Sequence, residues 1–142
     1  MDRIVVGVDG SESSKSALAW ALDEATLRDA TLELVHVYAP PMAYEGISSP
    51  VQAEELIQGP RRAAETLVKE LADGIDAVPV ETHALEDASA PRALVEHAAG
   101  ATMLVVSARG LGPFRRLLLG SVSQSVAHHA TCPVVIIPPA DA

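Results

Sequence analysis

Five short runs of apolar residues recur along the chain and alternate with segments of helical periodicity. Residues 4–8 and 103–106 are apolar almost without interruption, which is typical of central strands covered on both faces of a sheet. Residues 80–85 tend towards alternation of apolar and polar side chains, as expected of a strand nearer to an edge. The predicted strands are residues 4–8, 32–38, 80–85, 103–107 and 134–137.

Between these strands, apolar residues recur at the three-and-four spacing of amphipathic helices. The first predicted helix begins at a serine cap, either Ser11 or Ser13. In the second, Gly59-Pro60 either starts the helix or kinks an earlier turn. Pro91 can open the third helix, and the fourth begins near Ser121.

Strand and helix alternate to the end of the chain, which predicts a single α/β domain over residues 1–142. We expect a Rossmann-like fold, with a five-stranded parallel sheet and helices on both faces. The proline-rich residues 39–50 are expected to form a mobile loop over one edge of the sheet. Ligands of such sheets bind beyond the carboxyl ends of the strands, where the strand order reverses. If the first and fourth strands are neighbours, Asp9-Gly10 and residues 107–121 meet in one crevice.

The last predicted strand, Val134–Ile137, is β-branched, uncharged and expected at the sheet edge. An open strand of this kind invites pairing with another chain. Pro133 and Pro138-Pro139 bracket it. We predict that a second copy covers this strand, so that the protein is a homodimer.

Composition limits the class of partner. A net charge of -9 disfavours nucleic acids and anionic membranes. A small phosphorylated ligand remains compatible with this charge, because Arg109, Arg115 and Arg116 can oppose it at one site. Alternatively, these three arginines form only a solvated loop face. The single cysteine, Cys132, has no internal partner for a disulfide, and no signal sequence or bilayer-length apolar run is evident. The expected location is therefore the cytoplasm.

Several familiar motifs are absent. Asp9 stands where a Walker-type P-loop needs its first glycine, and the dinucleotide-binding glycines and the Gly-x-Ser-x-Gly elbow are missing. His128 and His129 point about 100° apart on a helix and do not easily share a metal. We expect structural roles for them and for His36 and His83, and no metal site.

The stretch from Ser107 to Ser121 is the strongest candidate site. It joins a strand to a helix, so its glycines fall where the backbone bends and where N–H groups become available to a ligand. Gly120 lets a phosphate approach, and Ser121 adds a hydroxyl at a helix N-terminus. Alternatively, Gly120 only turns the chain and Ser121 only caps the helix. Asp9 joins the candidate site because a carboxylate at the end of a buried strand needs solvent or a ligand.

The same stretch carries a family pattern. Ser107-Ala-Arg-Gly110 is followed after nine residues by Gly120-Ser121-Val-Ser-Gln, and then by Cys132-Pro-Val-Val. With Arg3-Ile-Val-Val-Gly-Val-Asp-Gly-Ser and Leu34-Val-His-Val37, the chain resembles the universal stress protein family. The signature of that family is Gly, two residues, Gly, nine residues, and Gly followed by Ser or Thr. One position departs from it, since Ser107 replaces the first glycine.

The resemblance implies a domain that is commonly a homodimer and, in the motif-bearing branch, binds ATP or AMP, with Mg²⁺ expected beside ATP. By position, Asp9 and Val37 would hold the adenosine end, with Gly7, Val8 and Val106 lining it. The residues that would surround the phosphates are Gly110, Gly120, Ser121, Val122 and Ser123, beside Ser107 and Arg109.

The leading hypothesis is an adenine-nucleotide-binding protein of the stress response that switches conformation or partners with nucleotide state. The sequence indicates no general base to activate water, so rapid hydrolysis is not expected. Two alternatives stay open. In the first, the protein is an enzyme in which Asp9 and a bound metal support slow ATP turnover or phosphate transfer to Ser121 or Ser123. In the second, the protein is a dimeric interaction module that has lost nucleotide binding through Ser107.

Overall fold

The computed structural model describes residues 2–41, 46–108 and 119–139, in which strands and helices alternate throughout. The strands are β1 (Arg3–Gly7), β2 (Thr31–Tyr38), β3 (Val80–Glu86), β4 (Met103–Ser107) and β5 (Val134–Ile137). The helices are α1 (Glu12–Arg28), α2 (Pro50–Ala72), α3 (Ala90–His97) and α4 (Ser121–His129). None of the helices in these ranges combines the length and the apolar character that crossing a membrane requires.

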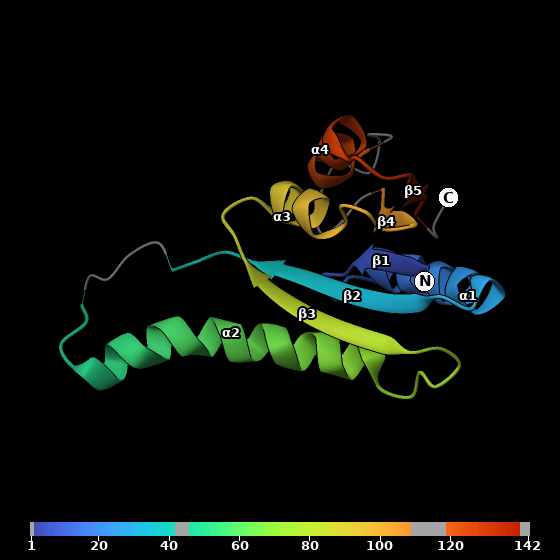
Figure 1. The fold of residues 1–142 in the computed structure, drawn as a ribbon. Coiled ribbons are helices and arrows are strands. Elements are labelled where there is room, and N and C mark those ends of the chain that lie inside the picture. The colour runs from blue at the N-terminus through green and yellow to red at the C-terminus, as the bar shows by residue number, and fades with distance from the viewer. Residues whose placement is uncertain (1, 42–45, 109–118, 140–142) are drawn as a thin grey trace.

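β1 lies at the centre of a five-stranded sheet whose order is β3-β2-β1-β4-β5 (Figure 1). All pairings are parallel, and Val5 of β1 lies between Glu33 of β2 and Leu104 of β4. The predicted α/β class, the parallel sheet and the edge positions of β3 and β5 are confirmed. β1 and β4 need their uninterrupted apolar runs because helices cover both of their faces.

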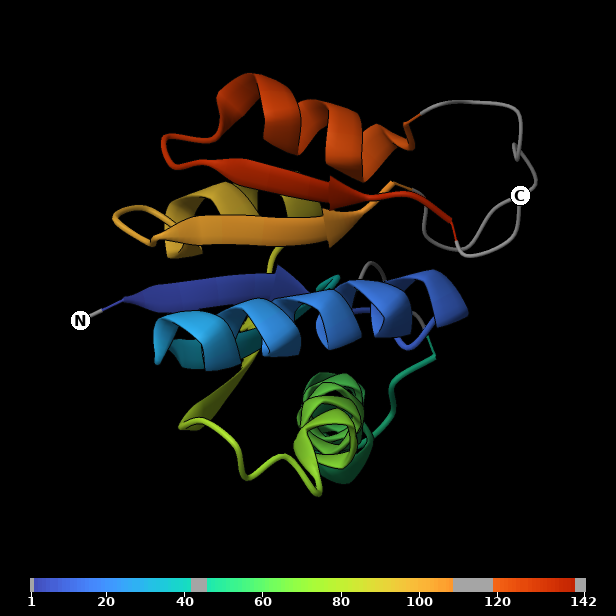
Figure 2. The same cartoon turned by 90° about the vertical axis from the view of Figure 1, so that its right-hand side faces the viewer.

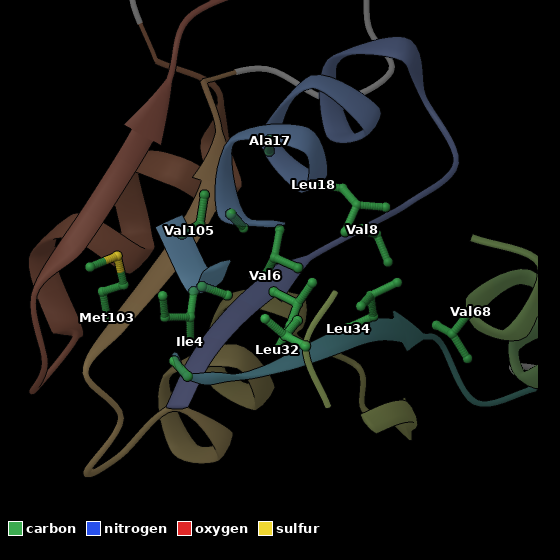
Figure 3. Close-up of a cluster of buried hydrophobic side chains, with 14 residues drawn as sticks. Ile4, Val6, Val8, Ala17, Leu18, Leu32, Leu34, Val68, Met103 and Val105 are labelled. Carbon is green, nitrogen blue, oxygen red and sulfur yellow. The ribbon is translucent and has the colours of Figure 1, made fainter. Parts of the chain in front are cut away.

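Two hydrophobic cores lie on opposite faces of the sheet. The first lies under α1 and α2 and includes Ile4, Val6, Leu18, Leu34 and Val68 (Figure 3). The second lies under α3 and α4 and includes Val5, Val35, Leu94, Leu104 and Val126. Figure 1 shows α2 and α3 on opposite sides of β2 and β3. Neighbouring residues such as Val5 and Val6 therefore face different cores, as the two-residue period of a strand requires.

α2 begins earlier than at Gly59-Pro60, so of the two alternatives for this pair the one in which it starts the helix is excluded, and Pro60 lies inside the helix. The helix starts at Pro50, after Ser49 accepts a hydrogen bond of 3.2 Å from the backbone N–H of Gln52. Proline is well placed in a first turn, where its missing N–H has no partner to lose. Pro60 removes one hydrogen bond inside the helix, while Ala64 and Val68 beyond it are buried against the sheet. The predicted loop thus ends at Ser49, and residues 42–45 of it lie outside the described ranges.

Serine caps fix the starts of two more helices. Ser11 caps α1 by accepting a hydrogen bond of 3.1 Å from the N–H of Ser14, so Ser11 is the cap and not Ser13. Ser89 caps α3 through the N–H of Arg92, and Pro91 lies in the first turn as predicted. These caps place the helices at the ends of the strands that precede them.

Candidate functional site

The strand order reverses next to β1. From β1 the chain moves outward to β2 and β3, and then returns to the other side of β1 with β4. Because β1 and β4 are parallel neighbours, Asp9, which follows β1, and Ser107, the last residue of β4, lie at the same edge of the sheet. Figure 2 shows the N-terminal ends of α1 and α4 at this edge. The condition for a shared crevice, that the first and fourth strands are adjacent, is met.

The turn after β1 is held by its own polar groups. Gly10 has a φ of +83°, a left-handed conformation that glycine adopts readily. Oδ1 of Asp9 accepts a hydrogen bond of 2.9 Å from the N–H of Ser11. The hydroxyl of Ser14 accepts one of 3.2 Å from the N–H of Asp9 and donates one of 3.0 Å to the carbonyl of Ser11. Asp9 is exposed, so solvent meets the requirement of its carboxylate and a ligand can reach it.

Sequence reasoning missed Ser14, which is 2% exposed and holds this turn in place. The helical period contained the signal for it. Ser14 lies three residues before Ala17 and four before Leu18, and both of these are buried on the face of α1 that packs on the sheet. A serine on the apolar stripe of a helix needs a local hydrogen-bond partner, and here that partner is the turn of Asp9.

At the same edge of the sheet, the carbonyl of Ala108 joins the end of β4 to the start of α4. It accepts hydrogen bonds from the N–H of Gly120 and, at 2.8 Å, from the hydroxyl of Ser123. The N–H of Ala108 donates to the carbonyl of Ile137 in β5 at 2.8 Å. One peptide segment thus links β4, the N-terminus of α4 and the end of β5.

The N-terminus of α4 has the character of an anion site. Gly120 is its N-cap, and no side chain among the described residues caps it. The first N–H groups of a helix lack acceptors within the helix, and the helix dipole adds positive potential there. Ser121 is exposed and Val122 is 38% exposed, whereas Ser123 is buried with its hydroxyl engaged. The hypothesis that Ser121 merely caps the helix is wrong, because Ser121 is already the first helical residue.

The residues predicted for the adenosine end divide between the two faces of the sheet. A Cβ on Gly7 would lie 3.3 Å from Cδ1 of Leu94 and 3.6 Å from Cγ1 of Val106. Gly7, Val106 and Val37 therefore belong to the face under α3 and α4. Val8 belongs to the opposite core. Both backbone groups of Val8 are also engaged, since its N–H donates to Val35 and its carbonyl accepts from Nδ1 of His36.

Two further predictions concern loop and histidine residues. Arg109 and Gly110 lie outside the described ranges, and Ser107 is half-buried at the end of β4. His36 has the structural contact expected of it, and Nδ1 of His129 lies 2.9 Å from the carbonyl of Ser125 within α4. His83 differs from both, because it lies in a cluster of ionisable side chains.

That cluster surrounds Glu33, a carboxylate that is only 5% exposed although it sits in the apolar strand β2. Oε2 accepts a hydrogen bond of 2.6 Å from Nε of Arg3, and Oε1 lies 2.7 Å from Nε2 of His97. Burial opposes ionisation of Glu33, but the hydrogen bonds from Arg3 and His97 outweigh it and hold the pKa of the carboxyl below its ordinary value. The signal in the sequence was Glu33 itself, a charge inside a buried run that requires partners.

With this geometry in view, comparison with known proteins identifies the family. The sequence profile of the universal stress protein family matches residues 1–138. The chain belongs to the universal stress protein family. A universal stress protein of Mycolicibacterium smegmatis is 38% identical over 144 residues, which cover 94% of this chain and 47% of that protein. The chain spans about half the length of the curated relatives that it matches first.

Two solved universal stress proteins share the fold and contain adenine nucleotides. A universal stress protein in complex with cAMP is 29% identical, with a TM-score of 0.68 and 96% of both chains covered. A universal stress protein family protein from Arabidopsis thaliana with AMP bound is 22% identical, with a TM-score of 0.64 over 99% of this chain and 97% of its own. Because the Arabidopsis protein is only 22% identical, its similarity to this chain shows the fold alone.

Proposed function

We propose that this chain is an adenine-nucleotide-binding regulatory protein of the stress response that binds ATP or AMP and acts as a homodimer. The observation that carries the proposal is the N-terminus of α4, which Ala108 anchors beyond β4 and which no described side chain caps. Its N–H groups lie at the edge where the strand order reverses, the usual ligand position in open α/β sheets. The cAMP in a relative of 29% identity supports an adenine nucleotide as the ligand.

In this proposal the adenosine lies on the face under α3 and α4. Gly7 packs closely against Leu94 and Val106 and adds no side chain at the end of β1, and Val37 supplies apolar surface on the same face. The exposed carboxylate of Asp9 accepts hydrogen bonds from hydroxyl or amino groups of the nucleoside. Val8 contributes only by shaping the end of β1, since its side chain belongs to the other core.

The phosphates lie against the start of α4. Gly120 presents no side chain there, and the N–H groups of Ser121 and Val122 with the hydroxyl of Ser121 face the anion. Ser123 acts through the hydrogen bond that holds the helix start. Ser107, Arg109 and Gly110 complete the phosphate side by their position in the family signature. Mg²⁺ is expected to enter with ATP, bound mainly by phosphate oxygens, and Asp9 adds a carboxylate of the kind that Mg²⁺ prefers.

Regulation follows from the connection between this site and β5. The N–H of Ala108 binds Ile137 of β5, and its carbonyl binds the first turn of α4. A ligand that binds to the N–H groups at the start of α4 therefore affects, through Ala108, the position of β5, the strand that we propose for the dimer contact. Val134–Ile137 forms a sheet edge and all four of its residues are half-buried, which leaves part of their apolar surface available to a second copy. We place this activity in the cytoplasm, consistent with the single cysteine, Cys132.

Two experiments on the purified full chain test the proposal. The first is calorimetry with ATP, AMP and cAMP, with and without Mg²⁺. The second is the identification of any nucleotide that is released when the protein is denatured. We expect one site per chain that prefers an adenine nucleotide over the matching guanine nucleotide. Absence of binding by every nucleotide would overturn the proposal and favour an interaction module, and Ser107→Gly would then show whether that side chain is the cause. Phosphate release above a Gly120→Val control would instead indicate slow hydrolysis. Phosphate transfer to the buried, hydrogen-bonded Ser123 is not expected.

A further inference from the structure

The ionisable cluster around Glu33 lies apart from the proposed nucleotide site. Glu33 is four residues before Val37 in β2, roughly 13 Å along the strand. His83 belongs to the edge strand β3, and His97 is the last residue of α3. The three side chains meet on the face of the sheet under α3, with their ligand atoms all within 4.8 Å of one another. This convergence comes from three separate elements and is not a property of any local motif.

The hydrogen bonding of this cluster is incomplete. Nε2 of His83 is buried and has no hydrogen-bond partner among the described residues. It lies 3.4 Å from Oε1 of Glu33 and 3.4 Å from Oε1 of Glu81. At these separations Nε2 makes no good hydrogen bond to either carboxylate. A buried polar atom in this position calls for another partner.

A metal ion satisfies all of these groups together. We propose that Glu33, His83 and His97 bind a divalent transition-metal ion through Oε1 and the two Nε2 atoms, with Zn²⁺ the best matched. Ligand atoms about 2.1 Å from a tetrahedral ion lie about 3.4 Å apart, which is the separation between Oε1 of Glu33 and Nε2 of His83. On binding, the ion displaces the proton that Nε2 of His97 shares with Glu33, and their separation widens from 2.7 Å.

The surroundings favour this ion over others. Two imidazole nitrogens and one carboxylate suit Zn²⁺ and disfavour Mg²⁺ or Ca²⁺, which prefer oxygen ligands. Arg3 donates mainly to Oε2 of Glu33, at 2.6 Å, and only weakly to Oε1, at 3.5 Å, so that Oε1 faces the two histidines; this is the kind of outer contact that orients metal ligands. A water molecule or the exposed Glu81 takes the fourth position. His83 is 30% exposed at its side chain, which gives the ion a route from solvent.

The expected consequence is a metal-dependent link between the edge strand and the helix. The ion ties side chains of β3 and of the end of α3 to Glu33 of β2, in addition to the parallel ladder that joins β2 to β3 and to the apolar contacts under α3. Metal bound to the folded state alone raises stability in proportion to its occupancy. The protein then responds to zinc as well as to nucleotide, at separate sites.

Titration of the metal-free full chain with Zn²⁺, in competition with a chromophoric chelator and without nucleotide, tests this proposal. We expect one ion per chain, a rise in Tm on addition of Zn²⁺, and the visible absorption of tetrahedral Co²⁺ when Co²⁺ replaces it. His83→Gln and His97→Gln should each weaken binding at least tenfold and abolish the rise in Tm. His129→Gln, which changes an exposed histidine on α4, is the matched control and should bind normally.

Two further readouts distinguish binding at this cluster from loss of the fold and from binding at the nucleotide site. The His83→Gln and His97→Gln variants should keep the wild-type circular dichroism without metal, because His83 loses only an unpartnered Nε2 and a glutamine at position 97 still offers a hydrogen-bond donor to Glu33. Gly120→Val should bind Zn²⁺ with unchanged affinity, since the nucleotide site is elsewhere. Equal Zn²⁺ affinity in wild type and in the His83→Gln/His97→Gln double variant would overturn the proposal, as would the loss of binding in the His129→Gln control alone.

Discussion

The hydroxyl of Ser123 donates a hydrogen bond of 2.8 Å to the carbonyl of Ala108, fifteen residues earlier in the chain. This bond joins the first turn of α4 to the end of β4, and Oγ of Ser123 is also 3.2 Å from the carbonyl of Gly120. The strand end and the helix start are thus held together on either side of the intervening segment. The position of the proposed phosphate site depends on this contact more than on any other side chain in the described ranges.

Ser123→Ala removes this contact from a buried position. A hydrogen bond of this kind contributes about 1 kcal/mol to the free energy of unfolding, and we expect a loss of that size in urea denaturation at pH 7. Nucleotide affinity should also fall, because the N–H groups of α4 are held less firmly. Ser121→Ala, at the exposed first position of the helix, is the matched control for stability and should change it by less than about 0.5 kcal/mol. Equal stabilities of the two variants would contradict this role.

Substitutions of Gly120 test whether a phosphate needs the space beside this residue, and they do so without straining the backbone. Its φ of -76° and ψ of 174° are open to any residue, so alanine or valine there keeps the fold at the expense of a weaker N-cap. We expect nucleotide affinity to fall progressively from Gly120 to Gly120→Ala to Gly120→Val, with a loss of at least tenfold in the last. Calorimetry measures the affinities, and circular dichroism checks the fold. Unchanged affinity in Gly120→Val would contradict the placement of the phosphates.

The hydrophobic pattern predicts most of this architecture because burial and periodicity are local properties of a sequence. β1 and β4 are apolar because helices cover both of their faces, and serines mark the starts of α1 and α3. The start of α2 stayed open between two alternatives because Pro60 is a strong breaker by propensity alone. Its effect is overcome by the burial of Ala64 and Val68, which depends on the sheet beneath them.

The residues of the candidate site also fall into those that the sequence indicates and those that it does not. Asp9 and Gly120 were selected as candidates because Asp9 follows a strand and Gly120 precedes a helix, and positions of this kind can be read from the chain. The structural use of Ser123 and the meeting of Glu33 with His83 and His97 were not predicted. Both depend on which groups of distant elements come within hydrogen-bonding reach, and sequence spacing contains no such information.

Arg3 and Glu33 provide a test of coupling in a buried ion pair. Arg3→Met leaves the carboxylate of Glu33 with His97 as its remaining hydrogen-bond partner and also removes the donor to the carbonyl of His97. We expect a loss of about 3 kcal/mol in the free energy of unfolding, because removal of Arg3 takes away the only guanidinium that the described residues place against this buried carboxylate. Addition of Glu33→Gln should recover part of this loss. A double-mutant cycle by chemical denaturation measures the coupling, and strict additivity would argue against it.

Asp87 predicts a pH dependence of stability at the start of α3. Its Oδ1 accepts hydrogen bonds of 2.8 Å from the N–H of Ser89 and 2.9 Å from Nη2 of Arg92. Both hydrogen bonds lower the pKa of the carboxyl from its ordinary value of 3.8, and the bond from Ser89 has the larger effect. A lowered pKa in the folded state means that the ionised form contributes stability above the ordinary pKa, and that this contribution disappears as the pH falls through the folded value.

Asp87→Asn isolates the charge because the amide keeps an oxygen at the same place. We expect the variant to be less stable than the wild type at pH 7, with a difference that shrinks below about pH 4. Urea midpoints at pH 7, 5 and 3 measure this difference. A constant difference over the whole range would show that the charge of Asp87 is not its cause.

β5 makes the proposed dimer testable through the direction of its backbone groups. The carbonyl of Pro133 accepts a hydrogen bond of 2.9 Å from the N–H of Leu104 in β4, and that of Ile137 accepts one of 2.8 Å from the N–H of Ala108 just beyond β4. In a parallel ladder, alternate residues point the same way, so Val135 also faces β4, whereas the N–H and carbonyl groups of Val134 and Ile136 face outward. Those outward groups are the ones available to a second copy.

Val134→Pro removes one outward N–H without removing a hydrogen bond to β4, and proline is tolerated on an edge strand in this orientation. We expect it to lower the proportion of dimer in analytical ultracentrifugation while the unfolding midpoint of the monomer changes little. Val135→Pro is the informative contrast, because it removes a bond within the sheet and should lower stability by several kcal/mol instead. A Val134→Pro variant with the dimer affinity of the wild type would place the contact between copies elsewhere. A wild-type chain that sediments as a monomer throughout the micromolar range would exclude the dimer.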